Sequence, residues 1–265
     1  MYFLGWVLCC LSYFQIEQRV KVWGERLLIL GVAVQLVFIV ASYTVMDTLL
    51  FNSLSGLLMF LSLLLILVLF ILNFYFPDQI FELVLTPLAI FFLILSVLIS
   101  DLPIISQEFL DRSTLFGRSL LIAHGSLSML GYLLFGVACL ASIFFLYQEK
   151  RIKNKTLLLQ KVKVPSLGFL DTIIFKMVIA GFLFLTVGLL LGINMSVSAN
   201  EGVPRLSLSL RQLLPVFTWS VYSILLISRS IIGIRGRNSA IWSIIGFLVA
   251  VISFVYEISL LTQQN

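Results

Sequence analysis

Residues 119–147, SLLIAHGSLSMLGYLLFGVACLASIFFLY, decide the fold of this chain. They form an apolar run without Asp, Glu, Lys or Arg, longer than the roughly 20 residues that an α-helix needs to cross a bilayer. The whole chain shares this character, because 61% of its 265 residues are hydrophobic and only 11% are charged. A soluble domain carries about 25% charged residues. The composition therefore predicts an integral membrane protein and excludes a soluble enzyme, a disordered tail or a nucleic-acid binder as its main body.

Seven further apolar runs accompany this one, which gives eight predicted spans. Their limits are about 2–14, 27–46, 53–76, 84–100, 119–147, 172–194, 212–230 and 239–262. The runs are continuous, without the alternation of apolar and polar residues that a membrane β-barrel shows. The predicted fold class is therefore all-α, a polytopic bundle of about eight transmembrane helices that forms a single membrane domain over residues 1–265. The first run is shorter than the 17–25 residues of an ordinary span.

The basic residues predict the orientation, because Lys and Arg are retained on the cytoplasmic side of a membrane. Most of the 17 Lys and Arg residues follow predicted spans 1, 5 and 7, and the densest group is QEKRIKNK at 148–155. Four arginines fall on the other side: Arg112, Arg118, Arg205 and Arg211. Both termini are therefore expected on the non-cytoplasmic side.

The chain has one histidine, His124. It falls about five residues inside its span, roughly 7 Å deep, in the non-cytoplasmic half of the membrane. Helical spacing places it on one face with Ser128, Gly131, Tyr132 and Phe135, and such a polar and aromatic stripe is not expected to face lipid. Neutral imidazole is a common ligand of haem iron, so His124 is a candidate metal ligand and Tyr132 a candidate neighbour of the cofactor. The alternative is a histidine that is hydrogen-bonded between packed helices, and the residues alone leave both interpretations open.

Charged residues near the non-cytoplasmic side are the other candidates for functional residues. Arg118 and Arg211 would suit the two propionates of a haem near His124, because guanidinium groups bind carboxylates bidentately. The alternative for both is a solvated loop charge. Glu257 is a costly carboxylate inside the last span, and it is interpreted either as a proton carrier that faces an outer cavity or as a side chain that reaches the interface.

The usual catalytic patterns are missing from the sequence. With one histidine, the chain cannot form HExxH or a two-histidine metal site, and it has neither a Walker A loop nor GxSxG. Its three cysteines contain no CxxC, which argues against covalent haem attachment and a thiol relay. We therefore expect that the protein is not an enzyme.

Three stretches resemble the transmembrane cytochrome c assembly family, which includes CcsA, CcmC and the smaller HemX/YpjD-like proteins. They are LIAHGSLSMLGYLLFGVACLASIFFLYQEKRIKNK, VPSLGFLDTIIFKMVIAGFLFLTVGLLLG and FTWSVYSILLISRSIIGIRGRNSAIWSIIGF, the last of which contains Trp219. Together they cover roughly 119–260, the predicted cytochrome c assembly-like region. Their order and spacing are most similar to the HemX/YpjD-like branch.

The resemblance implies a haem-handling protein that binds or passes haem at the non-cytoplasmic face for attachment to apocytochrome c. It implies haem as cofactor, other cytochrome c assembly membrane proteins as partners, and a bacterial inner (plasma) membrane as location. It implies His124 as an axial ligand and adds Trp219 to the candidate haem-binding residues.

The chain departs from the family in two places. The WWD segment of the larger members is absent, and Leu210-Arg211 stands where the small branch tends to carry His-Lys. Ligation of haem by two histidines of this chain is therefore impossible. Two alternatives stay open: a diverged member that acts as a non-haem scaffold or partner subunit, and a small-solute transporter that uses His124 and Glu257.

Overall fold

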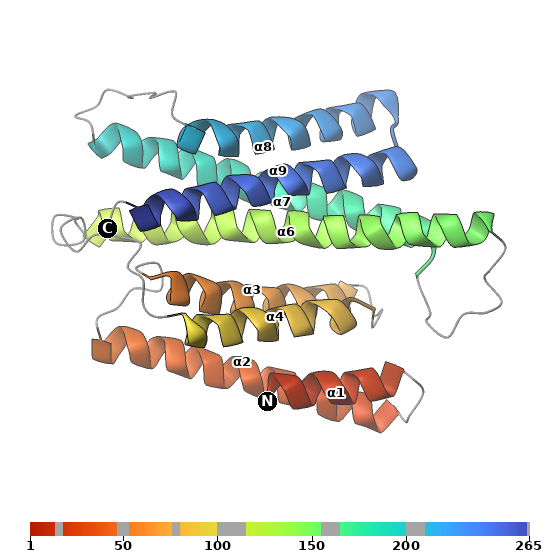
Figure 1. Ribbon diagram of the computed structural model, residues 1–265, viewed down its shortest axis with the longest axis horizontal. Coiled ribbons are helices and arrows are strands. Elements are labelled where there is room, and N and C mark those ends of the chain that lie inside the picture. Colours follow the sequence, from red (N-terminus) through yellow and green to blue (C-terminus); the bar gives the residue numbers. More distant parts are fainter. Residues whose placement is uncertain are drawn as a thin grey trace. The chain divides into compact units, whose positions relative to one another are not determined.

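The chain folds into α-helices in the computed structural model, which describes residues 1–13, 18–46, 53–75, 80–99, 115–154, 165–199 and 210–263. The helices are α1 (Tyr2–Tyr13), α2 (Gln18–Met46), α3 (Leu54–Tyr75), α4 (Ile80–Leu98), α6 (Leu115–Lys153), α7 (Leu167–Ala199), α8 (Leu210–Ile227) and α9 (Arg237–Gln263) (Figure 1). A five-residue π-helical turn, Ser228–Ile232, follows α8 directly. This architecture confirms the predicted all-α membrane bundle.

Seven of the described helices are long and apolar enough to cross a membrane. The remaining one, α1, has 12 residues. At 1.5 Å per residue it extends about 18 Å, whereas the hydrocarbon core is about 30 Å thick. The orientation of the helices in the membrane stays a prediction from the distribution of charge.

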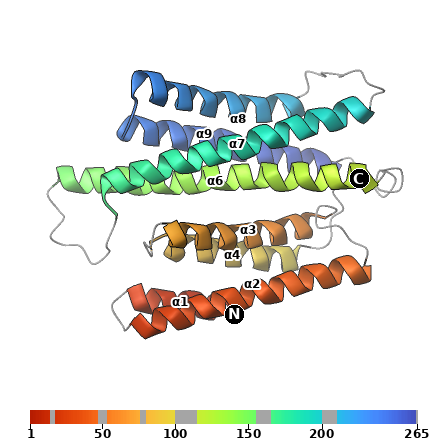
Figure 2. The ribbon, with the colours of Figure 1, turned by 180° about the vertical axis from the view of Figure 1, so that it is seen from behind.

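The helices group into two compact units, Met1–Gln107 and Glu108–Gln264, called here the N-terminal and C-terminal units. In the N-terminal unit, α1 packs against α2 and α4, and α3 packs along α4. In the C-terminal unit, α6, α7, α8 and α9 alternate in direction, and α7 lies along α6 over much of its length (Figures 1 and 2). Two compact units can share one membrane, so the single membrane domain over residues 1–265 stays a prediction.

Several helices extend beyond their predicted spans, among them α6 and α4. Helix α6 runs from Leu115 to Lys153 rather than from 119 to 147. Its last turn carries Lys150, Arg151 and Lys153, and cations at this end are stabilised by the helix dipole. Helix α4 begins at Ile80 rather than at 84, which brings Glu82 into the buried first turn of the helix.

Glycines allow α6 and α7 to pack closely. On α7, Gly181, Gly188 and Gly192 lie on one face, because their spacings of seven and four residues return to the same side of a helix. An ideal Cβ at Gly181 would lie 3.0 Å from the backbone oxygen of Gly131 on α6. An ideal Cβ at Gly131 would lie 3.0 Å from the backbone nitrogen of Leu185. A side chain at these positions would push the two backbones apart, so the glycines set the distance between the helices.

Candidate functional site

His124 lies in the contact between α6 and α7, where its Nδ1 is 2.7 Å from the backbone oxygen of Gly188. A carbonyl oxygen only accepts hydrogen bonds, so Nδ1 carries a hydrogen and donates it. In the neutral imidazole the lone pair is then on Nε2. Metal-ligating histidines are commonly held in this way, with one ring nitrogen donating to a backbone carbonyl. The structure thus confirms an interhelical hydrogen bond and keeps the lone pair on the nitrogen that a metal would need.

Two glycines of α7 make room for the imidazole. An ideal Cβ at Gly192 would lie 2.8 Å from Cε1 of His124, and an ideal Cβ at Gly188 would clash with the hydroxyl of Ser128. The imidazole itself is half-buried. A side chain at either glycine would therefore displace the histidine face of α6. The sequence pattern contained both glycines, but only the structure gives them this role.

Tyr132 belongs to the contact between α6 and α9. Its hydroxyl is 3.4 Å from Oγ of Ser253, and its ring centroid is 6.0 Å from that of Phe254. At about 1.5 Å and 100° per residue, Tyr132 lies about 12 Å along α6 from His124 and about 80° around it. Its role as a haem-binding residue stays a prediction.

Trp219 of α8 packs against another face of α7. Its Nε1 donates to Oγ1 of Thr186 at 2.9 Å, and its ring stacks on Phe182 with centroids 5.4 Å apart. Thr186 and Phe182 lie about 120–160° around α7 from Gly188, at about 100° per residue. The described contacts of Trp219 therefore join α7 to α8, and its predicted contact with haem stays a prediction.

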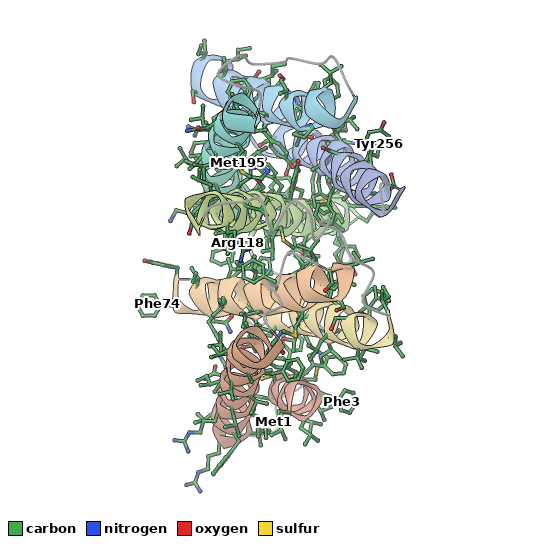
Figure 3. All side chains as sticks on the ribbon, turned by 90° about the vertical axis from the view of Figure 1, so that its left-hand side faces the viewer. Met1, Phe3, Phe74, Arg118, Met195 and Tyr256 are labelled. Carbon is green, nitrogen blue, oxygen red and sulfur yellow. The ribbon has the colours of Figure 1, made fainter. Side chains whose placement is uncertain are left out.

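The two predicted arginines lie in the first turns of helices. Arg118 is half-buried near the start of α6, roughly 9 Å along the helix before His124. Helix α6 begins at the end of the C-terminal unit where α7 and α9 end (Figure 1), and Figure 3 labels Arg118 together with Met195 of α7 and Tyr256 of α9. Arg211 lies in the first turn of α8, at the end of the unit where α6 also begins (Figure 1).

Several predicted side chains lie outside the described residues. This applies to the side chains of Arg211 and Glu257, whose backbones belong to α8 and α9, and to Arg112 and Arg205. The proposed roles of these charges therefore rest on the sequence.

The sequence analysis missed an ion pair at the opposite end of the C-terminal unit. Arg229, in the π-helical turn, donates from Nη2 to Oδ2 of Asp171 at 2.6 Å and from Nη1 to Oδ1 at 3.0 Å. Its Nη1 is also 2.9 Å from Oγ of Ser239, and the backbone nitrogen of Gly236 donates to Oδ1 of Asp171 at 3.0 Å. Gly236 has a φ of 66°, a backbone conformation that glycine adopts without strain. The paired groups connect α7 to the turn between α8 and α9, so they serve as a structural clamp.

Comparison with known proteins gives one family and several relatives. Residues 51–262 match the family model described as "Cytochrome C assembly protein". Protein HemX of Brevibacillus brevis is 26% identical over 163 residues, which are 62% of this chain and 57% of that protein. Cytochrome c biogenesis protein CcsA of Atropa belladonna is 31% identical over 154 residues, 49% of this chain and 48% of that protein. The CcsA protein of Prochlorococcus marinus (strain NATL1A) is 32% identical over 111 residues, 42% of this chain and 34% of that protein.

The extent of these matches decides what they establish. The chain spans about half the length of the first two relatives, 57% and 48%, and a smaller part of the third. The family match begins at residue 51 rather than at the predicted 119, so it includes α3 and α4 as well as nearly all of the C-terminal unit. Since the family model covers most of the sequence, including the helix that carries the only histidine, the chain belongs to the cytochrome c assembly protein family.

Proposed function

We propose that the protein handles haem for cytochrome c assembly, binding or passing it at the non-cytoplasmic face of a bacterial inner (plasma) membrane. Family membership supports the role in cytochrome c assembly, and the seven long apolar helices support a membrane location. The observation that carries haem binding is the donation from His124 Nδ1 to the Gly188 oxygen, because it orients the imidazole and leaves the lone pair on Nε2. The protein acts without bond-making chemistry of its own.

The residues at His124 would fit a haem. A neutral imidazole held by a backbone carbonyl is a suitable ligand for iron, so His124 would hold the iron. His124 is the only histidine of the chain, and any further iron ligand would come from water or a partner protein rather than from Tyr132. Bound haem would supply the iron centre and the group passed to apocytochrome c, while Arg118 and Arg211 would hold its propionates. Other cytochrome c assembly membrane proteins are the expected partners.

The test is a haem titration of the purified full chain in detergent, followed by the Soret band. The His124→Ala variant removes the axial ligand and should weaken binding by more than about tenfold. Gly192→Ala keeps the histidine but places a Cβ 2.8 Å from its ring, so it should also weaken binding. Gly168→Ala is the matched control on α7, because an ideal Cβ there meets nothing within 4 Å. Identical titrations of the wild type and His124→Ala would contradict the proposal.

The same hydrogen bond favours a second candidate, a non-haem membrane scaffold or partner subunit. In that case His124 serves only to join α6 to α7 through Gly188. Asn is the informative substitution, because its amide nitrogen keeps a donor for the Gly188 oxygen while it is a poor ligand for haem iron. In a deletion strain, His124→Asn would restore c-type cytochromes if the protein is a scaffold and would fail to restore them if His124 ligates haem.

A further inference from the structure

The N-terminal unit contains a buried carboxyl group that the proposed haem site does not use. Glu82, in the first turn of α4, is 2% exposed. Its Oε1 accepts a hydrogen bond of 2.5 Å from Nδ2 of Asn73 on α3. Within the part of the chain that the structure describes, Oε2 has no hydrogen-bond partner. One half of this carboxyl group is therefore satisfied and the other is not.

Thr86 adds a second unpartnered oxygen on the same side of α4. It follows Glu82 by four residues, which places the two side chains on one helix face. Thr86 is 0% exposed, and among the described residues its Oγ1 also lacks a hydrogen-bond partner. Buried polar atoms are rarely left unpaired, so two oxygens on this face of α4 lack the hydrogen bonds that buried polar groups usually make.

The groups around Glu82 come from the other three helices of the unit. Cys9 of α1 and Lys21 and Glu25 of α2 are titratable neighbours of the carboxyl group. Cys10 of α1 is a further titratable neighbour. Figure 1 shows that α1 and α3 end, and α2 and α4 begin, at this end of the unit. The carboxyl group therefore lies at the end of the unit that its polar neighbours also occupy.

No neighbouring cation neutralises Glu82 directly. Lys21 forms its ion pair with Glu25, at 3.5 Å across one turn of α2. In the described part of the chain, no Lys or Arg lies within ion-pair distance of Glu82. An ionised carboxylate is costly to bury without such a partner. A protonated carboxyl group avoids this cost and gains an O–H donor.

We propose that Glu82 is a proton-binding site within the N-terminal unit, whose carboxyl group carries a proton on Oε2 at neutral pH. Asn73 orients the group through Oε1, and the proton on Oε2 removes a buried negative charge that no cation of the described residues neutralises at ion-pair distance. The ligand is a proton, which exchanges with water at the end of the unit that carries Lys21 and Glu25. The site shares no residue with the proposed haem site at His124.

Infrared difference spectra of the full chain in detergent test the protonation state directly. The spectrum of the wild type minus Glu82→Gln, recorded at neutral pH, should show the carbonyl stretch of a protonated carboxylic acid, shifted in D₂O. Glu149→Gln is the matched control, because Glu149 is ion-paired with Lys153 at 2.7 Å and should give carboxylate bands. Carboxylate bands from Glu82 would overturn the proposal.

Thermal unfolding gives a second, independent readout. Gln has the shape of the protonated acid, so Glu82→Gln should unfold within about 2 °C of the wild type at neutral pH. At alkaline pH the wild type should lose stability relative to Glu82→Gln, because only the wild type can ionise at this buried position. A variant that is clearly less stable than the wild type at neutral pH, or a pH dependence that both proteins share, would overturn the proposal.

Discussion

A single hydrogen bond determines which nitrogen of the imidazole can act in the candidate site. Because His124 donates from Nδ1 to a backbone carbonyl, its orientation depends on the path of α7 and not on another side chain. Glycine at positions 188 and 192 is equally important for placing the imidazole, since a Cβ at Gly188 would meet Ser128 and a Cβ at Gly192 would meet the ring. At the scale of single residues, the site therefore consists of one histidine and the absence of two side chains.

A substitution of Trp219 tests whether this residue belongs to the candidate haem site. Trp219→Phe removes the donor to Thr186 but keeps an aromatic ring on Phe182. We expect a loss of about 0.5–1.5 kcal/mol in the free energy of unfolding, and the affinity for haem stays unchanged if Trp219 only joins α7 to α8. Thermal unfolding in detergent and haem titration measure the two effects.

The control for this prediction is Trp242→Phe on α9, because Trp242 is 44% exposed and should change neither quantity. A large loss of haem affinity in Trp219→Phe alone would instead support the role that the family resemblance assigns to this tryptophan.

At the scale of helices, the clamp between Arg229 and Asp171 fixes the turn that joins α8 to α9. The side chains of Arg229 and Asp171 are only 9% and 19% exposed, and the guanidinium group also lies 4.4 Å from the ring centroid of Phe175. Arg229→Gln leaves the carboxylate of Asp171 without its cation, so we expect a loss of about 2–4 kcal/mol in the free energy of unfolding. Asp171→Asn and the double variant complete a cycle that isolates the energy of the pair.

Arg237→Gln is the control for the clamp, because it changes an arginine close to the same turn. The side chain of Arg237 is 62% exposed, and its Nε lies 4.0 Å from Oε2 of Glu149. Exposed ion pairs contribute about 0–1 kcal/mol to the free energy of unfolding. Equal losses in Arg229→Gln and Arg237→Gln would show that the buried geometry adds nothing.

The helices were predictable from the sequence because uninterrupted apolar runs allow little else in a bilayer. The ends of the helices were less predictable, because a search for apolar runs ends each span at the first charged residues. Lys150, Arg151 and Lys153 extend α6 beyond its apolar part, and Glu82 lies inside α4 although the predicted span begins only at residue 84. Hydropathy alone does not distinguish a charged residue in water from one that neighbouring helices bury.

The candidate site was predictable in part, for a related reason. The face of α6 that carries His124 follows from helical spacing, and the glycines of α7 occur in the pattern that resembles the family. Which face of α7 meets α8 depends on packing, so the position of Trp219 could not be derived. The pair of Arg229 and Asp171 joins residues separated by 58 positions, and no local pattern indicates it.

At the scale of the whole molecule, the orientation in the membrane is the main prediction from charge. It can be tested with single cysteines in a chain whose native cysteines are changed to Ser. Asn154→Cys and Asn194→Cys lie at the ends of α6 and α7, two helices that run in opposite directions (Figure 2). In intact bacterial spheroplasts, a membrane-impermeant maleimide should label Asn194→Cys and leave Asn154→Cys unlabelled, because the charge distribution predicts the basic end of α6 on the cytoplasmic side.

Opening the membrane should make Asn154→Cys react as well, which confirms that its thiol is accessible. The reverse pattern, with Asn154→Cys labelled in intact spheroplasts, would invert the orientation and place His124 in the cytoplasmic half of the membrane.

Helix α6 is longer than a bilayer is thick. Its 39 residues extend about 58 Å, whereas a bilayer with its headgroups measures about 40–45 Å. With the apolar residues 119–147 across the bilayer and its headgroups, the charged end of the helix extends into the aqueous phase. A protein that binds this charged end and tilts it would tilt the whole of α6, including the part that carries His124. A force applied on one side of the membrane would then reach the other side through one continuous helix.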